Sequence, residues 1–126
     1  MDIAIVCGKY HEKEVSEMLA YAQDEAGKLG MTVKTVQWVS GAMEVPLSVQ
    51  RLIVNHEAVA CLGIIEKGET GHGAVLGQAV VSALIDLQLK HNKRVGLGII
   101  GPGAEPKHIP QRLEPHARAA ISCLRD

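Results

Sequence analysis

Hydrophobic positions in this sequence follow two alternating patterns, short apolar runs and apolar stripes at helical spacing. The run that starts at residue 58 is unbroken, as in a parallel strand buried on both faces, and the run that starts at residue 32 alternates and carries β-branched residues. The apolar runs predict strands over residues 3–7, 32–39, 58–65 and 94–100. The stripes predict helices over residues 12–29, 46–55 and 106–124, and a further helix with His72 in its first turn and apolar positions from Val75 to Leu87.

Strand and helix therefore alternate four times along the chain. This alternation is typical of a parallel sheet that is covered by helices on both faces and joined by right-handed crossovers. We expect a three-layer α/β sandwich of the flavodoxin-like kind, with a four-stranded parallel sheet in the order 2-1-3-4. A chain of 126 residues is long enough for one core and too short for two, so residues 1–126 are expected to form one domain.

Glycine and proline mark the expected ends of these elements. Gly30 has the usual position after the first helix, and Pro46 suits the first turn of the second. The fourth strand is expected to end at the turn Gly101-Pro102-Gly103. In the last helix Pro110 suits the first turn, whereas Pro115 lies deeper and is expected to kink the helix.

The loop after the third strand has the pattern of an anion site. It contains three glycines in six residues, over 68–73, together with Thr70 and His72. A strand that passes through such a loop into a helix directs free N–H groups, the positive end of the helix dipole and a Thr hydroxyl at one oxyanion. The glycines could equally serve the turn alone, Thr70 could be a plain N-cap, and His72 could be an ordinary solvated histidine.

The other strands also end in residues that suit a ligand. In parallel sheets ligands bind beyond the carboxyl ends of the strands. Tyr10 follows the first strand and offers a flat ring, Glu44 follows the second and offers a carboxylate, and the Gly101-Pro102-Gly103 turn allows close backbone approach after the fourth. Each has a plain alternative, because Tyr10 could be an edge tyrosine, Glu44 a dipole partner for the second helix, and the last segment a simple turn.

Composition narrows the classes of function. Hydrophobic residues are 47% of the chain and the net charge is −1, so charge gives no indication of a nucleic-acid or membrane-surface partner. No run approaches the roughly 18 apolar residues of a membrane span, and the first apolar stretch is too short for a signal peptide, so a cytoplasmic location is expected. Cys7, Cys61 and Cys123 are expected to be reduced thiols. With no His/Cys pairs at ligand spacing, no metal is expected.

Three segments together resemble the signature regions of the lumazine synthase family, and most closely its short archaeal-type members. They are Ser-Gly-Ala-Met-Glu-Val-Pro at 40–46, the segment 63–72 that ends in Gly-Glu-Thr-Gly-His, and Gly-Ile-Ile-Gly-Pro-Gly at 98–103. The resemblance covers essentially the whole chain in register. It implies condensation of 5-amino-6-(D-ribitylamino)uracil with 3,4-dihydroxy-2-butanone 4-phosphate to 6,7-dimethyl-8-ribityllumazine, the penultimate step of riboflavin synthesis. It also implies no cofactor, a homopentamer that in some members closes into an icosahedral capsid, and a site between neighbouring subunits.

The same resemblance implies roles for individual residues. His72 matches the acid/base, and Tyr10 matches the aromatic residue that stacks on the pyrimidine. Ala42, Met43 and Glu44 match the segment that holds the ribityl chain. The remaining implied positions are Gly41, Ile65, Lys67, Ile99 and Ile100 for substrate, and Glu69, Thr70 and Arg112 for phosphate, with Arg112 and the turn near Ile99 and Ile100 supplied by the neighbouring subunit. Whether Lys67, His116 or Arg118 also reaches the phosphate stays open.

The chemistry that these residues suit consists of Schiff-base formation, loss of phosphate and ring closure, for which one imidazole and a phosphate site suffice. Two alternatives of other classes stay open. A flavin- or pteridine-binding module would retain a bound chromophore and form no lumazine, and a shell-forming protein would have neither a bound chromophore nor activity. An archaeal-type riboflavin synthase is a further competitor that would act on lumazine alone.

Overall fold

Four parallel strands form the central layer of the molecule, in the order β2-β1-β3-β4. The computed structural model describes residues 1–68 and 70–125. Its main elements, in chain order, are β1 (Asp2–Gly8), α1 (Glu12–Lys28), β2 (Thr32–Val39), α2 (Val45–Ile53), β3 (Ala58–Glu66), α3 (His72–His91), β4 (Arg94–Ala104) and α4 (Leu113–Ser122). Short 3-10 helices are η1 (Ala42–Glu44), η2 (Pro106–His108), η3 (Pro110–Arg112) and η4 (Cys123–Arg125). The predicted sheet order and fold class are confirmed.

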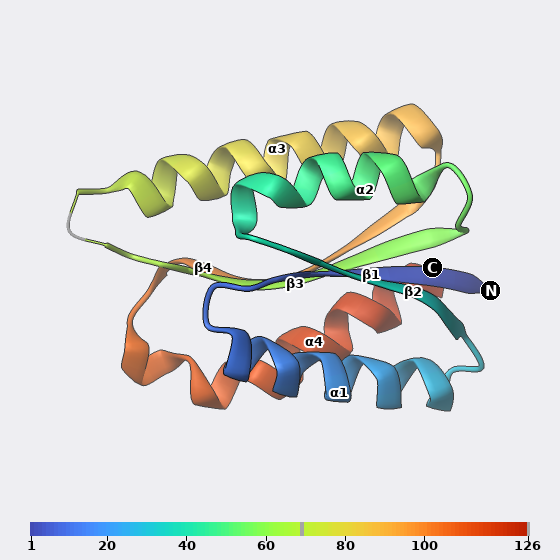
Figure 1. The fold of residues 1–126 in the computed structure, drawn as a ribbon, viewed down its shortest axis with the longest axis horizontal. Helices are drawn as coiled ribbons and strands as arrows, with labels where there is room; N and C mark the ends of the chain where they lie inside the picture. The colour runs from blue at the N-terminus through green and yellow to red at the C-terminus, as the bar shows by residue number, and fades with distance from the viewer. Residues whose placement is uncertain (69, 126) are drawn as a thin grey trace.

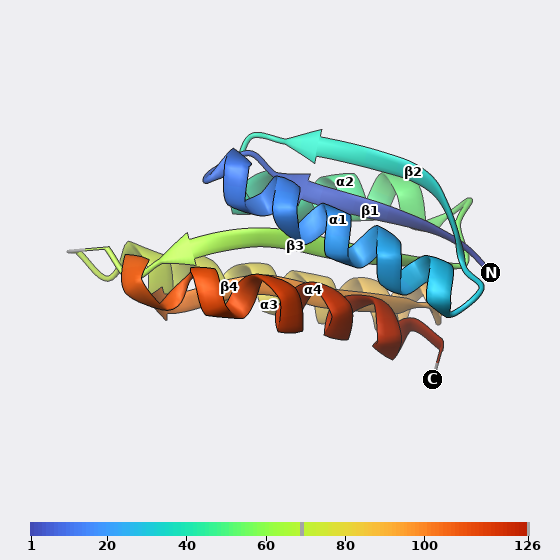
Figure 2. The ribbon, with the colours of Figure 1, turned by 90° about the horizontal axis from the view of Figure 1, so that it is seen from below.

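The helices lie in two layers, α2 and α3 on one face of the sheet and α1 and α4 on the other (Figure 1). Figure 2 shows that α1 and α2 lie over the β1–β2 half and α3 and α4 over the β3–β4 half. Each layer has its own core of aliphatic side chains, because alternate residues of the buried strands face opposite layers. Ile3 and Ile5 pack toward α1 and α4, whereas Ala4 and Val6 pack toward α2 and α3.

Most predicted boundaries hold to within one or two residues. β2 has the predicted bounds, β3 and α1 differ by one residue at one end, and β1 is one residue longer at each end. Gly30 follows α1 with φ 74°, a left-handed conformation that glycine adopts without a steric penalty. Pro46 lies in the first turn of α2, as expected.

The fourth strand was expected to end at Ile100, and that prediction is wrong. Ile100 pairs with Ile64, and pairing resumes between Ala104 and Glu66, so β4 carries an irregularity across residues 101–103 and continues. Gly101 and Gly103 both have positive φ, which lets the strand make this bulge. The segment is therefore part of the sheet and not a plain turn.

The prediction of a single helix over residues 106–124 is also wrong. The chain forms η2 and η3 before α4 begins at Leu113. Pro106 and Pro110 each begin a separate 3-10 helix. Pro115 is then the third residue of α4, where the missing backbone N–H removes no internal helical bond, so no kink is required.

Helix α3 differs from the other helices in the apolar surface that it exposes. Val75, Ile85 and Leu89 are exposed large hydrophobic residues, while Val80 and Leu84 are buried against the sheet. By length and composition this one helix, among the described residues, could cross a membrane, a property that the sequence analysis did not expect. The same test is passed by core helices of soluble proteins, and α3 packs along the sheet beside α2 (Figure 1).

Candidate active site

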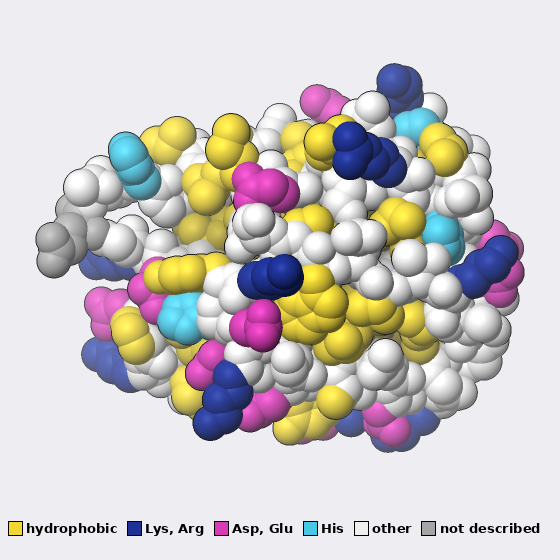
Figure 3. All heavy atoms as spheres, viewed as in Figure 1, with side chains coloured by type: hydrophobic (Ala, Val, Ile, Leu, Met, Phe, Trp, Pro, Cys, Tyr) yellow, Lys and Arg dark blue, Asp and Glu magenta, His cyan; other side chains and the backbone are white. Residues whose placement is uncertain are grey.

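A cavity of about 730 Å³ lies at the carboxyl end of the sheet. In Figure 3 hydrophobic side chains gather in a hollow at the left of the view, where the strand ends meet the layer of α2 and α3. The end of β1, the segment between β2 and α2, the end of β3 and the first two turns of α3 all contribute to the walls. The lining residues are Tyr10, Ser40, Gly41, Ala42, Met43, Glu44, Ile64, Ile65, Glu66, Gly68, His72, Gly73, Val75, Leu76 and Ala79.

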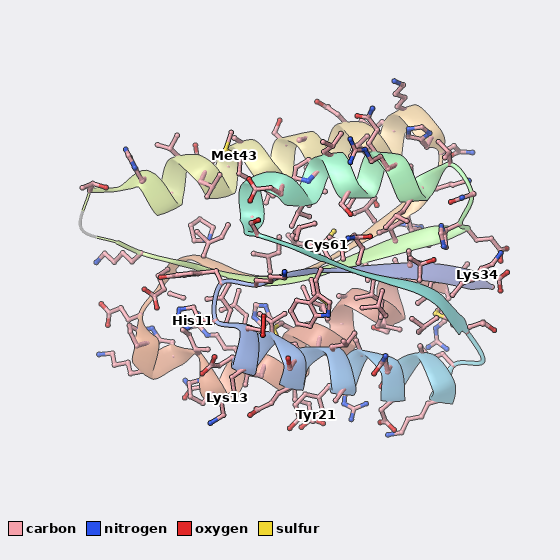
Figure 4. The ribbon with its side chains drawn as sticks, in the orientation of Figure 1. His11, Lys13, Tyr21, Lys34, Met43 and Cys61 are labelled. Atoms are coloured by element: carbon pink, nitrogen blue, oxygen red, sulfur yellow. The ribbon has the colours of Figure 1, made fainter. Side chains whose placement is uncertain are left out.

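This cavity brings together most of the residues selected from the sequence. Parallel strands end at one edge of a sheet, so residues far apart in the chain become neighbours there. Figure 4 shows Met43 on the α2 side of the sheet at the same end as His11, which lies at the start of α1. The predicted site residues that line the cavity are Tyr10, Gly41, Ala42, Met43, Glu44, Ile65 and His72.

The start of α3 forms one wall of the cavity. Gly71 precedes the helix with φ 76°, and His72 is the first helical residue, exposed beside the cavity. A side chain at Gly73 would overlap the carbonyl oxygen of Glu66, so only glycine lets the first turn lie against the end of β3. The N–H groups of this turn have no partner within the helix and provide a positive local potential.

Thr70 does not cap α3. The cap position belongs to Gly71 and carries no side-chain hydrogen bond, which removes the plain N-cap alternative for Thr70. Thr70 is exposed and is absent from the cavity lining. Glu69, predicted as a phosphate-loop residue, lies outside the described residues.

Tyr10 takes part in a small network that joins two strand ends. Its hydroxyl donates to Glu66 Oε2 at 3.2 Å, and its ring meets the His11 ring edge-on at 4.4 Å between centroids. His11 Nε2 donates to Glu66 Oε1 at 2.6 Å. The pKa of the Tyr10 hydroxyl is raised by desolvation and by the adjacent Glu66 carboxylate, so the hydroxyl remains a donor.

Glu44 is exposed and lines the main cavity, and its Oε1 lies 3.5 Å from where a Cβ on Gly41 would stand. It holds the N-cap position of α2 without a capping hydrogen bond, so its charge lies at the positive end of that helix, as the alternative of a dipole partner requires. A second cavity of about 350 Å³, between β2 and α2, shares Ser40 and Glu44 with the first. The carboxylate is therefore open to hydrogen-bond donors from a ligand.

The remaining predicted residues lie outside the cavity in this chain. Ile99 and Ile100 are buried core residues on opposite faces of the sheet, and the exposed Lys67 follows β3. Arg112 ends η3 in the layer of α4. It lies near His116, whose pKa is lowered by desolvation and by the Arg112 charge.

Arg118 has another role in the structure. It contacts Asp24 and Glu25 of α1 and Glu114 of α4 at 2.8, 3.0 and 2.8 Å. Neither Arg118 nor any other Lys or Arg lines the described cavity. Within residues 1–68 and 70–125, no group of three or more His, Cys, Asp or Glu is placed to hold a metal ion.

Sequence reasoning did not select several lining residues. Glu66 directly follows the apolar run of β3, and its charge at a strand end was an available signal. Val75, Leu76 and Ala79 follow His72 at helical spacings of three, four and seven residues, which places all four on one face of α3. The apolar stripe of this helix was interpreted only as core, although part of it faces the cavity.

The fold and the cavity define a class of protein, a parallel α/β sandwich that binds a small ligand beyond its strand ends. The sequence model of the 6,7-dimethyl-8-ribityllumazine synthase family matches residues 1–125. The protein named 6,7-dimethyl-8-ribityllumazine synthase in Aeropyrum pernix is 38% identical to this chain, over 94% of this chain and 83% of that protein. Its namesake in Staphylothermus marinus is 34% identical, over 97% of this chain and 83% of that protein. The enzyme of that name in Metallosphaera sedula is 36% identical over 94% and 80%. The chain belongs to the lumazine synthase family.

Proposed function

We propose that this chain condenses 5-amino-6-(D-ribitylamino)uracil with 3,4-dihydroxy-2-butanone 4-phosphate in the cavity at the carboxyl end of the sheet. The product is 6,7-dimethyl-8-ribityllumazine, and phosphate and water are released. The family membership supports the reaction. The observation that supports the place is that an aromatic ring, a carboxylate and an imidazole, those of Tyr10, Glu44 and His72, line one cavity.

Each of these groups has a chemical task in the proposal. The Tyr10 ring stacks on the flat pyrimidine, and the Glu44 carboxylate accepts hydrogen bonds from ribityl hydroxyls. The reaction consists of proton transfers around Schiff-base formation, phosphate loss and ring closure, and an imidazole such as His72 exchanges protons near neutral pH. Holding two substrates face to face supplies much of the remaining rate enhancement.

The proposed phosphate site combines residues from more than one copy of the chain. The N–H groups at the start of α3 and the nearby Thr70 hydroxyl suit an oxyanion, but no cationic side chain lines the described cavity. We propose that Arg112 of a neighbouring copy supplies the positive charge at the phosphate site. The assembly proposed is a homopentamer, and its proposed location is the cytoplasm. The apolar surface of α3, with Val75, Ile85 and Leu89 exposed, supports self-association because such patches mark contact sites.

The decisive experiment mixes both substrates with the purified protein and follows lumazine absorbance. We expect lumazine to form, and we expect His72→Ala to slow turnover about 10²-fold, as is typical when a general acid/base is lost. Arg112→Ala should mainly raise KM for the phosphorylated ketone. A protein that binds lumazine and never makes it would contradict the proposal and would favour a non-catalytic pteridine-binding module.

A further inference from the structure

The side chain of Tyr10 is exposed to solvent, but a hydrogen bond restricts the rotation of its ring. It is 52% exposed, so packing alone gives its ring little restraint. Its hydroxyl is nevertheless held by Glu66 Oε2, a residue of a different strand end that also lines the cavity. The ring is thus attached to the sheet at its polar tip, 56 residues away in the sequence.

Glu66 is itself fixed by a second partner. His11 Nε2 lies 2.6 Å from Glu66 Oε1, and the two side chains are only 26% and 28% exposed. Both carboxylate oxygens are therefore engaged, one by His11 and one by Tyr10. A partly buried carboxylate with two donors has a defined position, because moving it would break both hydrogen bonds.

The backbone at His11 supports the same arrangement. His11 has φ 60° and ψ 50°, a left-handed conformation that costs a residue with a Cβ about 1–2 kcal/mol. Its carbonyl oxygen accepts the first hydrogen bond of α1, from Val15 N at 3.0 Å. This conformation begins the helix and directs the imidazole back toward Glu66 at the end of β3. Uncommon conformations of this kind persist where surrounding contacts determine them.

A ring that is held before a ligand arrives binds it more tightly. Immobilising a flexible side chain on binding costs about 0.5–1.5 kcal/mol, and that cost disappears when the chain is already fixed. Stacking also depends on the offset and tilt of the two rings. A phenol with its hydroxyl attached to the cavity wall meets both conditions, whereas a phenylalanine at this position would lack the attachment.

We propose that Glu66 and His11 are positioning residues that hold the Tyr10 ring over the cavity for the heterocycle of the substrate. The proposal rests on the function proposed above. Glu66 acts through Tyr10, and His11 acts through Glu66, so neither is assigned a part in proton transfer. The ligand that senses the network is the flat pyrimidine or lumazine ring and not the phosphorylated ketone.

The test compares Tyr10→Phe, Glu66→Met and the double variant with the unmodified protein. Tyr10→Phe keeps the ring and removes the donor, and Glu66→Met keeps the length and removes the acceptor. Each single change should raise KM for the pyrimidine and Kd for 6,7-dimethyl-8-ribityllumazine about three- to tenfold, the worth of one hydrogen bond. KM for the phosphorylated ketone should not change. The double variant should have a Kd for lumazine no higher than that of the single variant with the higher Kd, because both changes break the same contact.

Two further variants keep the test sharp. In His11→Asn the new residue tolerates the left-handed conformation but is too short to reach Glu66. This change should weaken lumazine binding in the protein that has Tyr10, and should have no further effect in the Tyr10→Phe variant. Tyr21→Phe, in α1 beside Arg118 and outside the cavity lining, is the matched control and should bind as before (Figure 4). Fluorescence titration with lumazine measures Kd for all of them, and thermal melts confirm folding.

The outcomes separate this proposal from the function on which it rests. An unmodified protein that forms no lumazine would overturn the function. A protein that forms lumazine, but whose Tyr10→Phe variant binds it unchanged, would overturn the positioning role alone. Losses that multiply in the double variant would also overturn it, since Glu66 would then act on the ligand directly.

Discussion

The two helical layers of the sandwich meet solvent in different ways. The layer of α1 and α4, the closed layer, buries its apolar side chains and joins its helices through Arg118, which contacts three carboxylates and the Tyr21 ring. The layer of α2 and α3, the open layer, contains the cavity and exposes Met43, Leu47, Val54, Ile85 and Leu89. One layer buries its apolar side chains within a single chain, and the other offers apolar surface to a partner.

The difference shows how one sheet separates stability from function. Both layers pack on the same buried strands, so the fold does not require the exposed face of α3. The ligand cavity lies where the open layer meets the strand ends, and the cation that a phosphate needs is missing from its described walls. In the proposed assembly a neighbouring copy would cover the apolar surface of the open layer and would supply Arg112, which lies in the layer of α4 of that copy.

The largest effect is expected from placing a charge on the open layer. Ile85→Lys should leave the chain folded, because this side chain is 47% exposed, and should prevent assembly because a charge buried in an apolar contact is not compensated. Lumazine formation should fall to background in the same sample. Sedimentation analysis measures the assembly, and Ala20→Lys on the exposed face of α1 is the control. An Ile85→Lys variant that remains assembled would place the interface elsewhere.

The fold could be predicted from the sequence because the strands follow one kind of hydrophobic pattern, short apolar runs, and the helices follow another, apolar stripes at helical spacing. Four buried runs separated by amphipathic stripes admit few arrangements, and right-handed crossovers reduce them further. The errors lie where proline and glycine act in tertiary context. Pro115 was assigned to the interior of a long helix, but Pro106 and Pro110 divide that segment and leave Pro115 in a first turn. The segment 101–103 was interpreted as a turn, but it bulges within β4.

The site was predictable as far as it lies on strand ends. Tyr10, Glu44 and His72 each follow a strand, and parallel topology brings them together. The contact of Glu66 with Tyr10 and His11 depends on side-chain directions across two strands, which no spacing in the sequence encodes. Ile99 and Ile100 lie within the predicted strand and are buried on opposite faces of the sheet, whereas the family resemblance alone implied that they contact substrate.

A core substitution in the closed layer should produce the next largest effect. Ile121 of α4 is fully buried against the sheet and α1, so Ile121→Ala removes most of this side chain and leaves a cavity. We expect a loss of about 2–5 kcal/mol in the free energy of unfolding, measured by urea denaturation. Glu17→Ala, on the exposed side of α1, should change it by less than about 0.5 kcal/mol. Equal losses in the two variants would contradict the assignment of this core.

The Arg118 network should contribute a smaller, pH-dependent part of the stability. Arg118 and then Lys28 hold the pKa of Asp24 below its ordinary value, so the folded state favours the ionised carboxylate. This contribution is present above the unfolded pKa of about 3.9 and is lost as the pH falls through the lower folded value. Arg118→Met should therefore lower the melting temperature at pH 7 and have less effect near pH 3. A difference that grows as the pH falls would exclude this origin.

The smallest effect concerns the reactivity of the thiols. It tests whether a reagent reaches the core between the sheet and the open layer. Cys7 faces the core of the closed layer. Cys61 faces that of the open layer and lies near the middle of the sheet (Figure 4). Burial raises the pKa of Cys7 to about 12 and raises that of Cys61 as well, whereas Cys123 is partly exposed. Because the thiolate is the reactive form, iodoacetamide should modify Cys123 first and the other two only as the protein unfolds. Mass spectrometry of native and denatured samples distinguishes the sites. Equal protection of Cys7 and Cys61 means that the open layer is sealed along the sheet and opens only at the strand ends, whereas early modification of Cys61 would mean that α2 and α3 separate from the sheet together.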